Sequence, residues 1–262
     1  MLSTPQLTDS HCHLDRIDLT SFDGKIENVL KAAQEMAVQR FLCVNIDLEH
    51  FSRIQALSQQ YPNIYCSVGV HPTAIDTEEP SVEKLITLAQ TERVIAIGET
   101  GLDYFRLKKE EVDWQRKRFR RHIRAANQCK KPLIIHTRSA REDTLRILKE
   151  EQAQQAQGVM HCFAEDWETA KQAMDLGFYI SFSGIITFKN AADLREVAQK
   201  VPEDFLLVET DSPWLAPVPK RGKLNQPAYT RYVAEKLAEI RGVSFEHIAE
   251  LTEANFQRLF QI

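Results

Sequence analysis

Apolar runs of strand length recur along the whole chain, and this repetition most limits the folds that the chain can adopt. The runs are rich in Val, Ile, Leu and Phe and mostly lack polar alternation, so they indicate strands that are buried on both faces. The predicted strands span residues 7–13, 41–46, 64–71, 94–98, 133–136, 159–163, 178–183 and 206–210. Strands of this kind are typical of parallel sheets that helices cover on the outside.

The segments between these runs carry apolar residues at helical spacing. Phe119 and Ile123, for example, lie four residues apart and would share one face of a helix. The predicted helices span residues 28–38, 114–129, 142–148 and 167–176, and the tail 228–262 predicts two more against one side of the sheet.

Eight strands that alternate with helices predict parallel β–α–β units. The closed (β/α)8 barrel, or TIM barrel, satisfies that pattern at about 250 residues, and this chain has 262. An open, doubly wound α/β sheet is the alternative fold. No linker rich in Pro, Gly or Ser interrupts the sequence, so we expect a single TIM-barrel domain over residues 1–262.

Composition limits the location of the chain and its partners. The apolar runs are too short to span a bilayer, and the opening residues MLSTPQLTDSHCHL lack the basic start and apolar core of a signal peptide. Five cysteines without a C-x-x-C pair predict reduced thiols in a cytoplasmic protein. The net charge of −4 does not itself indicate a nucleic-acid binder, although basic loops and metal ions can hold phosphates on an acidic chain.

The motif His11-Cys12-His13 ends the first predicted strand. Alternate residues of a strand point the same way, so the two histidines share one face. Further candidate ligands follow at the ends of later strands, and these are Glu99, His136, His161 and Asp211. Imidazoles and carboxylates together are ligands of divalent transition metals. Because barrel active sites lie at the carboxyl ends of the strands, we predict that the six side chains form one metal site.

Two alternatives concern these residues. The six candidates could be unrelated core polar groups, but a buried carboxylate without a cation is costly. The thiols of Cys12 and Cys162 could bind zinc. Strand alternation turns each thiol away from the neighbouring histidine, so we expect both thiols in the core.

Longer motifs extend over essentially the full chain. They are DSHCHLD (9–15), VGVHP (68–72), GETGLDY (98–104), IIHTR (134–138), HCF (161–163), ISFSGIITFKNA (180–191) and LLVETDSPWLAPVPKRGKLNQP (206–227). With these motifs the sequence resembles the TatD family of metal-dependent deoxyribonucleases, and within it most closely the YcfH-type members. Trp214 is a departure, because many members carry Tyr there, and it should affect the shape of the pocket more than the chemistry.

The resemblance implies a (β/α)8 hydrolase that cleaves phosphodiester bonds in DNA, with 3′→5′ exonuclease action in some members. It also implies two divalent metal ions, for which Mg²⁺, Mn²⁺ and Zn²⁺ are all compatible with the ligands. By analogy the first ion is held by His11, His13 and Asp211, the second by His136 and His161, and Glu99 bridges the two.

In the two-metal mechanism that this assignment implies, an activated water attacks the phosphorus in line with the leaving oxygen. Glu99 would give one carboxylate oxygen to each ion, and Asp211 would also accept the proton of the attacking water. His71, at the end of the third strand, is predicted to bind a non-bridging phosphate oxygen. The alternative for His71 is a structural histidine that caps the loop before Pro72.

Three further polar residues are assigned near the site. Glu209, two residues before Asp211, is predicted to steer a ligand histidine, with a structural ion pair as the alternative. Asp103 is predicted to support the ligands in the same way. Arg138 is predicted to contact phosphate because its planar fork matches phosphate geometry, and a salt bridge to Asp103 or Glu99 is the alternative.

Basic and aromatic residues at the same end of the barrel predict contacts with DNA. Trp214 and Tyr104 are candidate stacking surfaces for a base, with ordinary packing as the alternative. The run 116–124 is strongly basic, but it lies on a predicted helix whose apolar side faces inward, so we expect its charges to face solvent. The residues predicted to hold the nucleic-acid backbone are Lys220, Arg221, Lys223, Arg106, Lys108 and Lys109.

These predictions favour a cytoplasmic hydrolase whose partner is DNA, single-stranded or at frayed ends, with no membrane and no obligate protein partner. One alternative is an amidohydrolase, lactonase or phosphotriesterase-type enzyme for a small molecule, since such barrels share the order of ligands. Many of those enzymes bridge their metals with a modified lysine where this chain has Glu99. The other alternative is a non-catalytic metal-bound scaffold, which the complete ligand series disfavours.

Overall fold

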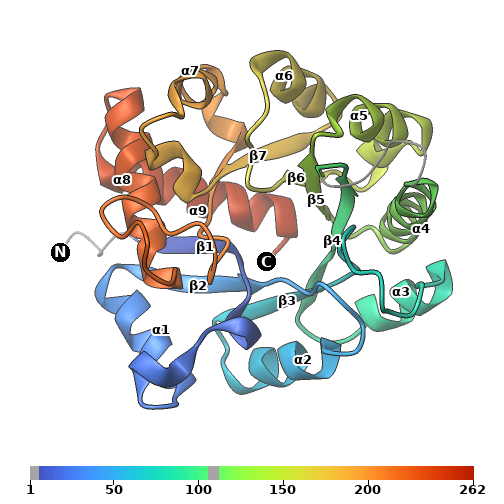
Figure 1. Cartoon of the computed structure of the whole chain (residues 1–262), viewed down its shortest axis with the longest axis horizontal. Coiled ribbons are helices and arrows are strands. Elements are labelled where there is room, and N and C mark those ends of the chain that lie inside the picture. The colour runs from blue at the N-terminus through green and yellow to red at the C-terminus, as the bar shows by residue number, and fades with distance from the viewer. Residues whose placement is uncertain (1–5, 106–111) are drawn as a thin grey trace. The chain divides into compact units, whose positions relative to one another are not determined.

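The computed structural model describes residues 6–105 and 112–262. Within these residues, strands β1 to β8 lie in chain order in one eight-stranded sheet (Figure 1). Their bounds are β1 Leu7–Cys12, β2 Val38–Cys43, β3 Ile64–Val68, β4 Val94–Asp103, β5 Leu133–Arg138, β6 Gly158–Met160, β7 Phe178–Phe182 and β8 Leu206–Val208.

The first strand pairs with the chain that follows the last strand. Cys12 and Ser212 form a parallel bridge, and the His13 N–H donates to the Ser212 carbonyl at 2.9 Å. The Asp211 N–H donates to the His11 carbonyl, also at 2.9 Å. The sheet thus closes as a (β/α)8 barrel, which confirms the predicted fold and excludes the open, doubly wound sheet.

Helices alternate with the strands. They are α1 Ile26–Glu35, α2 Phe51–Gln60, α3 Val82–Ala89, α4 Asp113–Cys129, α5 Arg141–Glu150, α6 Trp167–Asp175, α7 Ala192–Lys200, α8 Thr230–Arg241 and α9 Phe245–Phe260. The sequence pattern predicts all of these except α2, α3 and α7. In α2 the buried residues are Phe51, Ile54 and Ser58, so its apolar stripe is narrow and the sequence signal is weak.

β4 and β5 are longer than the apolar pattern predicts. The predicted strands end at Gly98, directly before Glu99, and at His136, whereas the two strands stay paired as far as Asp103 and Arg138. Gly101 has a φ of +135°, and a Cβ there would lie 2.0 Å from the His136 carbonyl oxygen, so glycine is required for this close approach. Glu99 and His136 therefore lie within strands and not at their ends as predicted.

The backbone divides into two compact units. Unit 1 comprises Met1–Cys43, Cys162–Trp167 and Ile180–Ile262, and unit 2 comprises Val44–His161 and Glu168–Tyr179. In unit 1, α9 packs against β1, β8 and α8, and Figure 1 shows α9 next to β1. The two helices predicted in the tail therefore cover strands of the sheet, as expected. The organisation as a single domain stays a prediction.

In unit 2, α3 and α4 pack against each other and against β4 (Figure 1). Phe119 and Ile123 of α4 are fully buried, as predicted, but His122 is also fully buried and Arg118 is only 2% exposed. The prediction that the charges of this run face solvent was therefore wrong for Arg118. The sequence pattern gives no sign of its partner, because Glu79 comes from a distant segment.

The burial of His122 makes the free energy of unfolding depend on pH. Desolvation lowers the pKa of His122 from 6.5 to about 4, so the unfolded chain binds more protons than the folded chain between these two values. The free energy of unfolding should therefore fall by about 3 kcal/mol from this group as the pH falls from 6.5 to 4. Chemical unfolding of the metal-free wild type and of His122→Gln measures the difference, and equal pH slopes would contradict this expectation.

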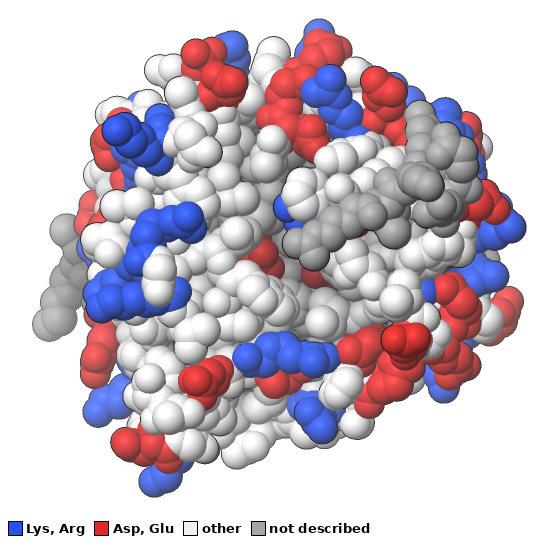
Figure 2. All heavy atoms as spheres, viewed as in Figure 1, with Lys and Arg blue, Asp and Glu red and all other residues white. Residues whose placement is uncertain are grey.

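Within the described residues, no helix combines the length and the apolar character that crossing a membrane requires. On the face drawn in Figure 2, acidic and basic side chains are interspersed, and basic side chains gather over the loop that precedes α8. That loop contains Lys220, Arg221 and Lys223. A chain with a net charge of −4 thus carries a locally basic surface.

Candidate metal centre

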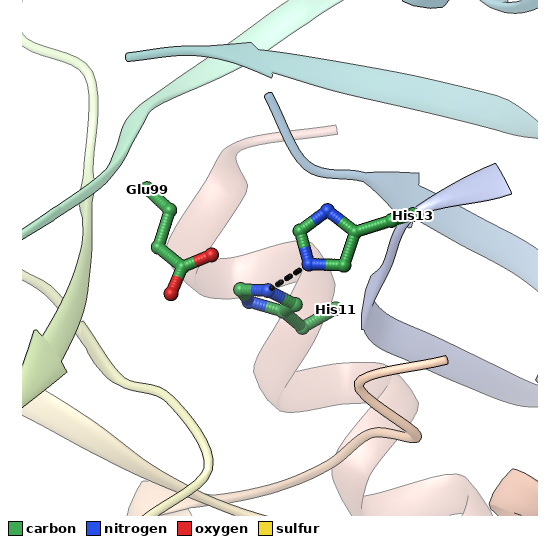
Figure 3. A group of neighbouring side chains, drawn as sticks. All are labelled: His11, His13 and Glu99. Atoms are coloured by element: carbon green, nitrogen blue, oxygen red, sulfur yellow. Dashed lines mark hydrogen bonds between the residues drawn. The ribbon is translucent and has the colours of Figure 1, made fainter. Parts of the chain in front are cut away.

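In unit 1, β1 and the residues after β8 bring His11, His13 and Asp211 together. The Nε2 atoms of His11 and His13 lie 3.2 Å apart, the contact that Figure 3 marks with a dashed line. Asp211 Oδ1 lies 3.7 Å from His11 Nε2 and 3.5 Å from His13 Nε2. Two imidazole nitrogens and one carboxylate oxygen therefore converge, and they belong to the three residues assigned to the first ion.

Asp9 connects β1 to the segment that carries Asp211, and it is absent from the predicted site. Asp9 Oδ1 accepts the Thr210 N–H at 2.9 Å, and Oδ2 accepts the Thr210 hydroxyl at 2.6 Å. Burial raises the pKa of Asp9 to about 7. These bonds hold the backbone just before Asp211, which has a left-handed φ of 56°. Strand alternation places Asp9 on the same face as His11, and this is the sequence signal that points to it.

In unit 2, three imidazoles surround one oxygen of Glu99. Glu99 Oε1 lies 2.9 Å from His161 Nε2, 3.2 Å from His71 Nε2 and 3.2 Å from His136 Nδ1. Glu99 itself is 3% exposed, and Figure 3 draws its carboxylate. The structure thus brings Glu99, His136 and His161 together and adds His71 to the cluster.

Asp103 determines which nitrogen of His136 carries the proton. His136 Nε2 donates to Asp103 Oδ2 at 3.0 Å, so in the neutral imidazole the lone pair is on Nδ1, which faces Glu99. Burial would lower the pKa of His136, but the carboxylates of Asp103 and Glu99 stabilise the protonated ring, in which both nitrogens are donors, and the pKa is raised. Burial would raise the pKa of Asp103, and hydrogen bonds from His136 and the Phe105 N–H lower it. A carboxylate that fixes the tautomer of a histidine is a common support of metal ligands.

His71 presents an N–H toward Glu99, and not a lone pair. The Thr73 N–H donates to His71 Nδ1 at 3.1 Å, so Nδ1 is an acceptor and the proton is on Nε2. Burial lowers the pKa of His71, although Glu99 opposes the shift, so burial favours the neutral ring. A neutral N–H donor suits a phosphate oxygen better than it suits a metal ion, which supports the substrate role assigned to His71.

Two buried polar residues hold the backbone at Glu99, and neither is in the predicted site. The Glu99 N–H donates to the Asn45 carbonyl at 2.8 Å. The Ser67 hydroxyl donates to the Gly98 carbonyl at 2.6 Å and accepts the Asn45 N–H at 3.0 Å. A single polar residue within an apolar strand is a weak sequence signal. The role of Asn45 and Ser67 is visible only in the folded chain, where they bind the backbone next to Glu99.

Glu209 is fully buried and supports the segment after β6. Its Oε1 accepts the Cys162 N–H at 2.8 Å, and Cys162 has a left-handed φ of 43°. Because positive φ is unfavourable for a residue with a side chain, this bond stabilises the backbone directly after His161. The support that Glu209 gives to this ligand candidate thus runs through the main chain.

The two thiols next to the histidines differ in burial. Cys12 is buried, as predicted, whereas Cys162 is only partly buried, with its Sγ 3.1 Å from the Ser183 hydroxyl. The prediction for Cys162 was wrong because β6 ends at Met160, so strand alternation does not apply two residues later.

Arg138 and Tyr104 have contacts of different kinds. The Arg138 guanidinium is exposed and lies 3.7 Å from the centre of the Phe105 ring. The Tyr104 hydroxyl donates a hydrogen bond to Asp143 Oδ2 at 2.8 Å and accepts one from the Nε–H of Arg116 at 3.0 Å. This bonding of Tyr104 corresponds to the packing alternative, while Arg138 keeps its charge at the surface.

Trp214 and Arg221 lie in the loop after β8. Trp214 is 48% exposed, and its ring centroid lies 5.0 Å from that of His13 at an interplanar angle of 67°. The Arg221 guanidinium lies 3.9 Å from the centre of the Phe188 ring. An accessible aromatic ring therefore lies next to a ligand candidate. The predicted contacts Arg106, Lys108 and Lys109 lie outside the described residues.

The two sets of side chains fit divalent metal ions. Each set combines imidazole nitrogens with a carboxylate oxygen, a mixture that Zn²⁺ and Mn²⁺ accept, and the carboxylates also suit Mg²⁺. Glu99 is almost completely buried, where a negative charge requires compensation. The chemistry of the donor atoms therefore agrees with metal binding in both units.

A closed (β/α)8 barrel with these imidazole and carboxylate sets defines the class of metal-dependent hydrolases. The family model described as TatD related DNase matches residues 8–261. The chain belongs to the TatD family, as its motifs predict.

Relatives and solved structures agree with this class. YcfH of Escherichia coli strain K12, an uncharacterized metal-dependent hydrolase, is 49% identical over 257 residues, which cover 98% of this chain and 96% of YcfH. YabD of Bacillus subtilis strain 168, described in the same words, is 42% identical and covers 98% and 99% of the two chains. The crystal structure of YJJV, a TatD homolog from Escherichia coli, has a TM-score of 0.90 at 27% identity, with 98% and 99% covered.

Proposed function

We propose that this hydrolase cleaves phosphodiester bonds in DNA with the help of two divalent ions, Mg²⁺, Mn²⁺ or Zn²⁺. The family description, TatD related DNase, and the locally basic loop before α8 support DNA as the substrate. The proposal includes 3′→5′ exonuclease action on single-stranded DNA or frayed ends.

The pair of ligand sets is the observation that carries the proposal. Asp211 lies with His11 and His13 in unit 1, and Glu99 lies with His136 and His161 in unit 2. In-line displacement at phosphorus places negative charge on the attacking and the leaving oxygen, and two cations compensate both. We assign the bridging position to Glu99 on the family resemblance.

When bound, the ions would supply a water of lowered pKa and positive charge for the phosphate. Asp211, whose side chain is 15% exposed, is reachable and would accept the proton of that water at a carboxylate oxygen. His71 would donate its Nε2–H to a non-bridging phosphate oxygen, and Asp103 would keep Nδ1 of His136 unprotonated. Arg138 and Arg221 would contact phosphates along the strand.

Removal and return of metal test this function. We expect chelator-treated protein to be inactive, and Mn²⁺ or Mg²⁺ to restore shortening of a single-stranded oligonucleotide from its 3′ end. Lactones, amides and an RNA of the same sequence are assayed in parallel. Turnover of a lactone or an amide without any cleavage of DNA would contradict the proposal and favour a small-molecule hydrolase.

Trp214→Ala should weaken the binding of DNA without impairing the chemistry. Stacking of a base on an aromatic ring contributes about 1–3 kcal/mol, so we expect KM for a single-stranded oligonucleotide to rise about tenfold or more. Bis(p-nitrophenyl) phosphate, which has no base, should be hydrolysed at the wild-type rate. Trp214→Tyr is the matched control and should keep most of the affinity, and equal KM values for all three proteins would contradict the stacking role.

A further inference from the structure

Arg118 is a charged residue of α4 that has no role in the proposed mechanism, although it is only 2% exposed. Its guanidinium lies 4.8 Å from the centre of the Trp114 ring and forms an ion pair with Glu79. A buried charge is unfavourable unless its hydrogen-bonding groups are satisfied. The partners of its N–H groups therefore indicate what this arginine stabilises.

The fork of Arg118 binds both ends of the turn that begins at His71. Nη1 of Arg118 donates to the His71 carbonyl at 2.8 Å and to the Ala74 carbonyl at 2.7 Å. The Ala74 N–H donates to the same His71 carbonyl at 3.1 Å and closes the turn. Nε of Arg118 donates to Glu79 at 3.1 Å. One side chain thus holds the turn at two carbonyl groups and is itself held by a carboxylate.

His122, one helical turn further along α4, holds the chain on the other side of His71. Its Nδ1–H donates to the Arg118 carbonyl at 2.9 Å, so Nε2 is an acceptor and receives the Val70 N–H at 3.0 Å. Burial lowers the pKa of His122 to about 4, and the acceptor therefore stays unprotonated at neutral pH. α4 binds the main chain on both sides of the His71 side chain.

We infer that Arg118, together with His122, is a positioning residue that sets where the Nε2–H of His71 points. Nε2 of His71 lies 3.2 Å from Glu99 Oε1 and 3.4 Å from His136 Nδ1. The same turn also places the Thr73 N–H that fixes the tautomer of His71. The inference rests on the proposed contact of His71 with phosphate, which is the function that this geometry would serve.

The variant Arg118→Lys separates this positioning role from the effect of positive charge alone. Its ammonium keeps the positive charge but cannot span two carbonyls and a carboxylate as the planar guanidinium does. We expect Arg118→Lys to fold, to bind Mn²⁺ as the wild type does, and to lose about 10–100-fold in kcat on a single-stranded oligonucleotide with little change in KM. Arg121→Lys is the matched control, because Arg121 also pairs with Glu79, at 3.1 Å, but is 38% exposed, and it should stay within about twofold of the wild type.

A double-mutant cycle with His71→Ala then tests the coupling. If Arg118 acts through His71, the double variant has the same kcat as His71→Ala alone. Losses that multiply would overturn the inference, and so would wild-type kcat in Arg118→Lys. If Arg118→Lys does not fold, His122→Gln replaces it in the same cycle with the same two criteria.

An NMR measurement without substrate keeps this inference distinct from the proposed function. In ¹⁵N-histidine-labelled protein, wild-type His71 should show one Nε2–H tautomer, and Arg118→Lys should show a mixture of tautomers. Identical His71 signals in both proteins would overturn the positioning role, even in a protein that cleaves DNA. If the wild type does not cleave DNA but His71 shows one tautomer in the wild type and a mixture in Arg118→Lys, only the proposed function is contradicted.

Discussion

The Glu99→Gln variant is expected to lose at least about 10³-fold in kcat on DNA while it stays folded. Glutamine keeps the size of the side chain but removes the charge that three imidazole nitrogens face at 2.9 Å to 3.2 Å. If Glu99 bridges the two ions, its neutral replacement weakens both. The loss should therefore appear in kcat and in metal content together.

The measurement for Glu99→Gln combines single-turnover cleavage of an oligonucleotide with metal analysis after dialysis. Glu142→Gln removes a carboxylate from an exposed position of α5 and is the matched control, expected to match the wild type in both. A Glu99→Gln protein that retains wild-type turnover would refute the bridging role. A protein that fails to fold would show that the carboxylate is needed for stability.

The Asp211→Asn variant is expected to lose about 10³-fold in kcat for two reasons, because Asp211 is proposed both to hold an ion and to accept a proton. Its Oδ1 faces the Nε2 atoms of His11 and His13, and Asn would offer a neutral oxygen of similar shape. The set in unit 2 keeps all of its own side chains. We therefore expect this variant to keep one ion per chain, whereas Glu99→Gln loses both.

Two measurements separate the roles of Asp211. Metal analysis gives the number of ions retained, and the pH profile of kcat shows whether the acidic limb of the wild type disappears with the carboxylate. Asp193→Asn, at an exposed position in α7, is the control and should change neither. Two ions per chain with wild-type kcat in Asp211→Asn would contradict both roles.

The fold could be predicted because its strands are apolar on both faces and alternate with segments of helical period. Strand ends were less predictable, since β4 continues to Asp103 only because Gly101 permits the close approach to β5. α2 was missed because Ser58, one of its three buried residues, is polar and weakens the apolar stripe. The order of the elements can thus be predicted from local sequence patterns, whereas their lengths depend on contacts between distant segments.

The candidate ligands could be selected from the sequence because their residue types near predicted strand ends are visible there, although Glu99 and His136 lie within β4 and β5. The contacts that orient these ligands could not be predicted from the sequence. Asp103 fixes the tautomer of His136 across 33 residues of sequence, and Arg118 reaches the turn at His71 from a helix 47 residues away. The helical period and the composition predict that Arg118 lies on a charged surface, and only its tertiary partners explain its burial.

Crystals soaked in Mn²⁺ and measured at the manganese absorption edge test the central claim most directly. Two anomalous peaks per chain are predicted, one in contact with His11, His13 and Asp211 and the other with His136 and His161, both touching Glu99. No peak under saturating Mn²⁺, or peaks that avoid these side chains, would contradict the account.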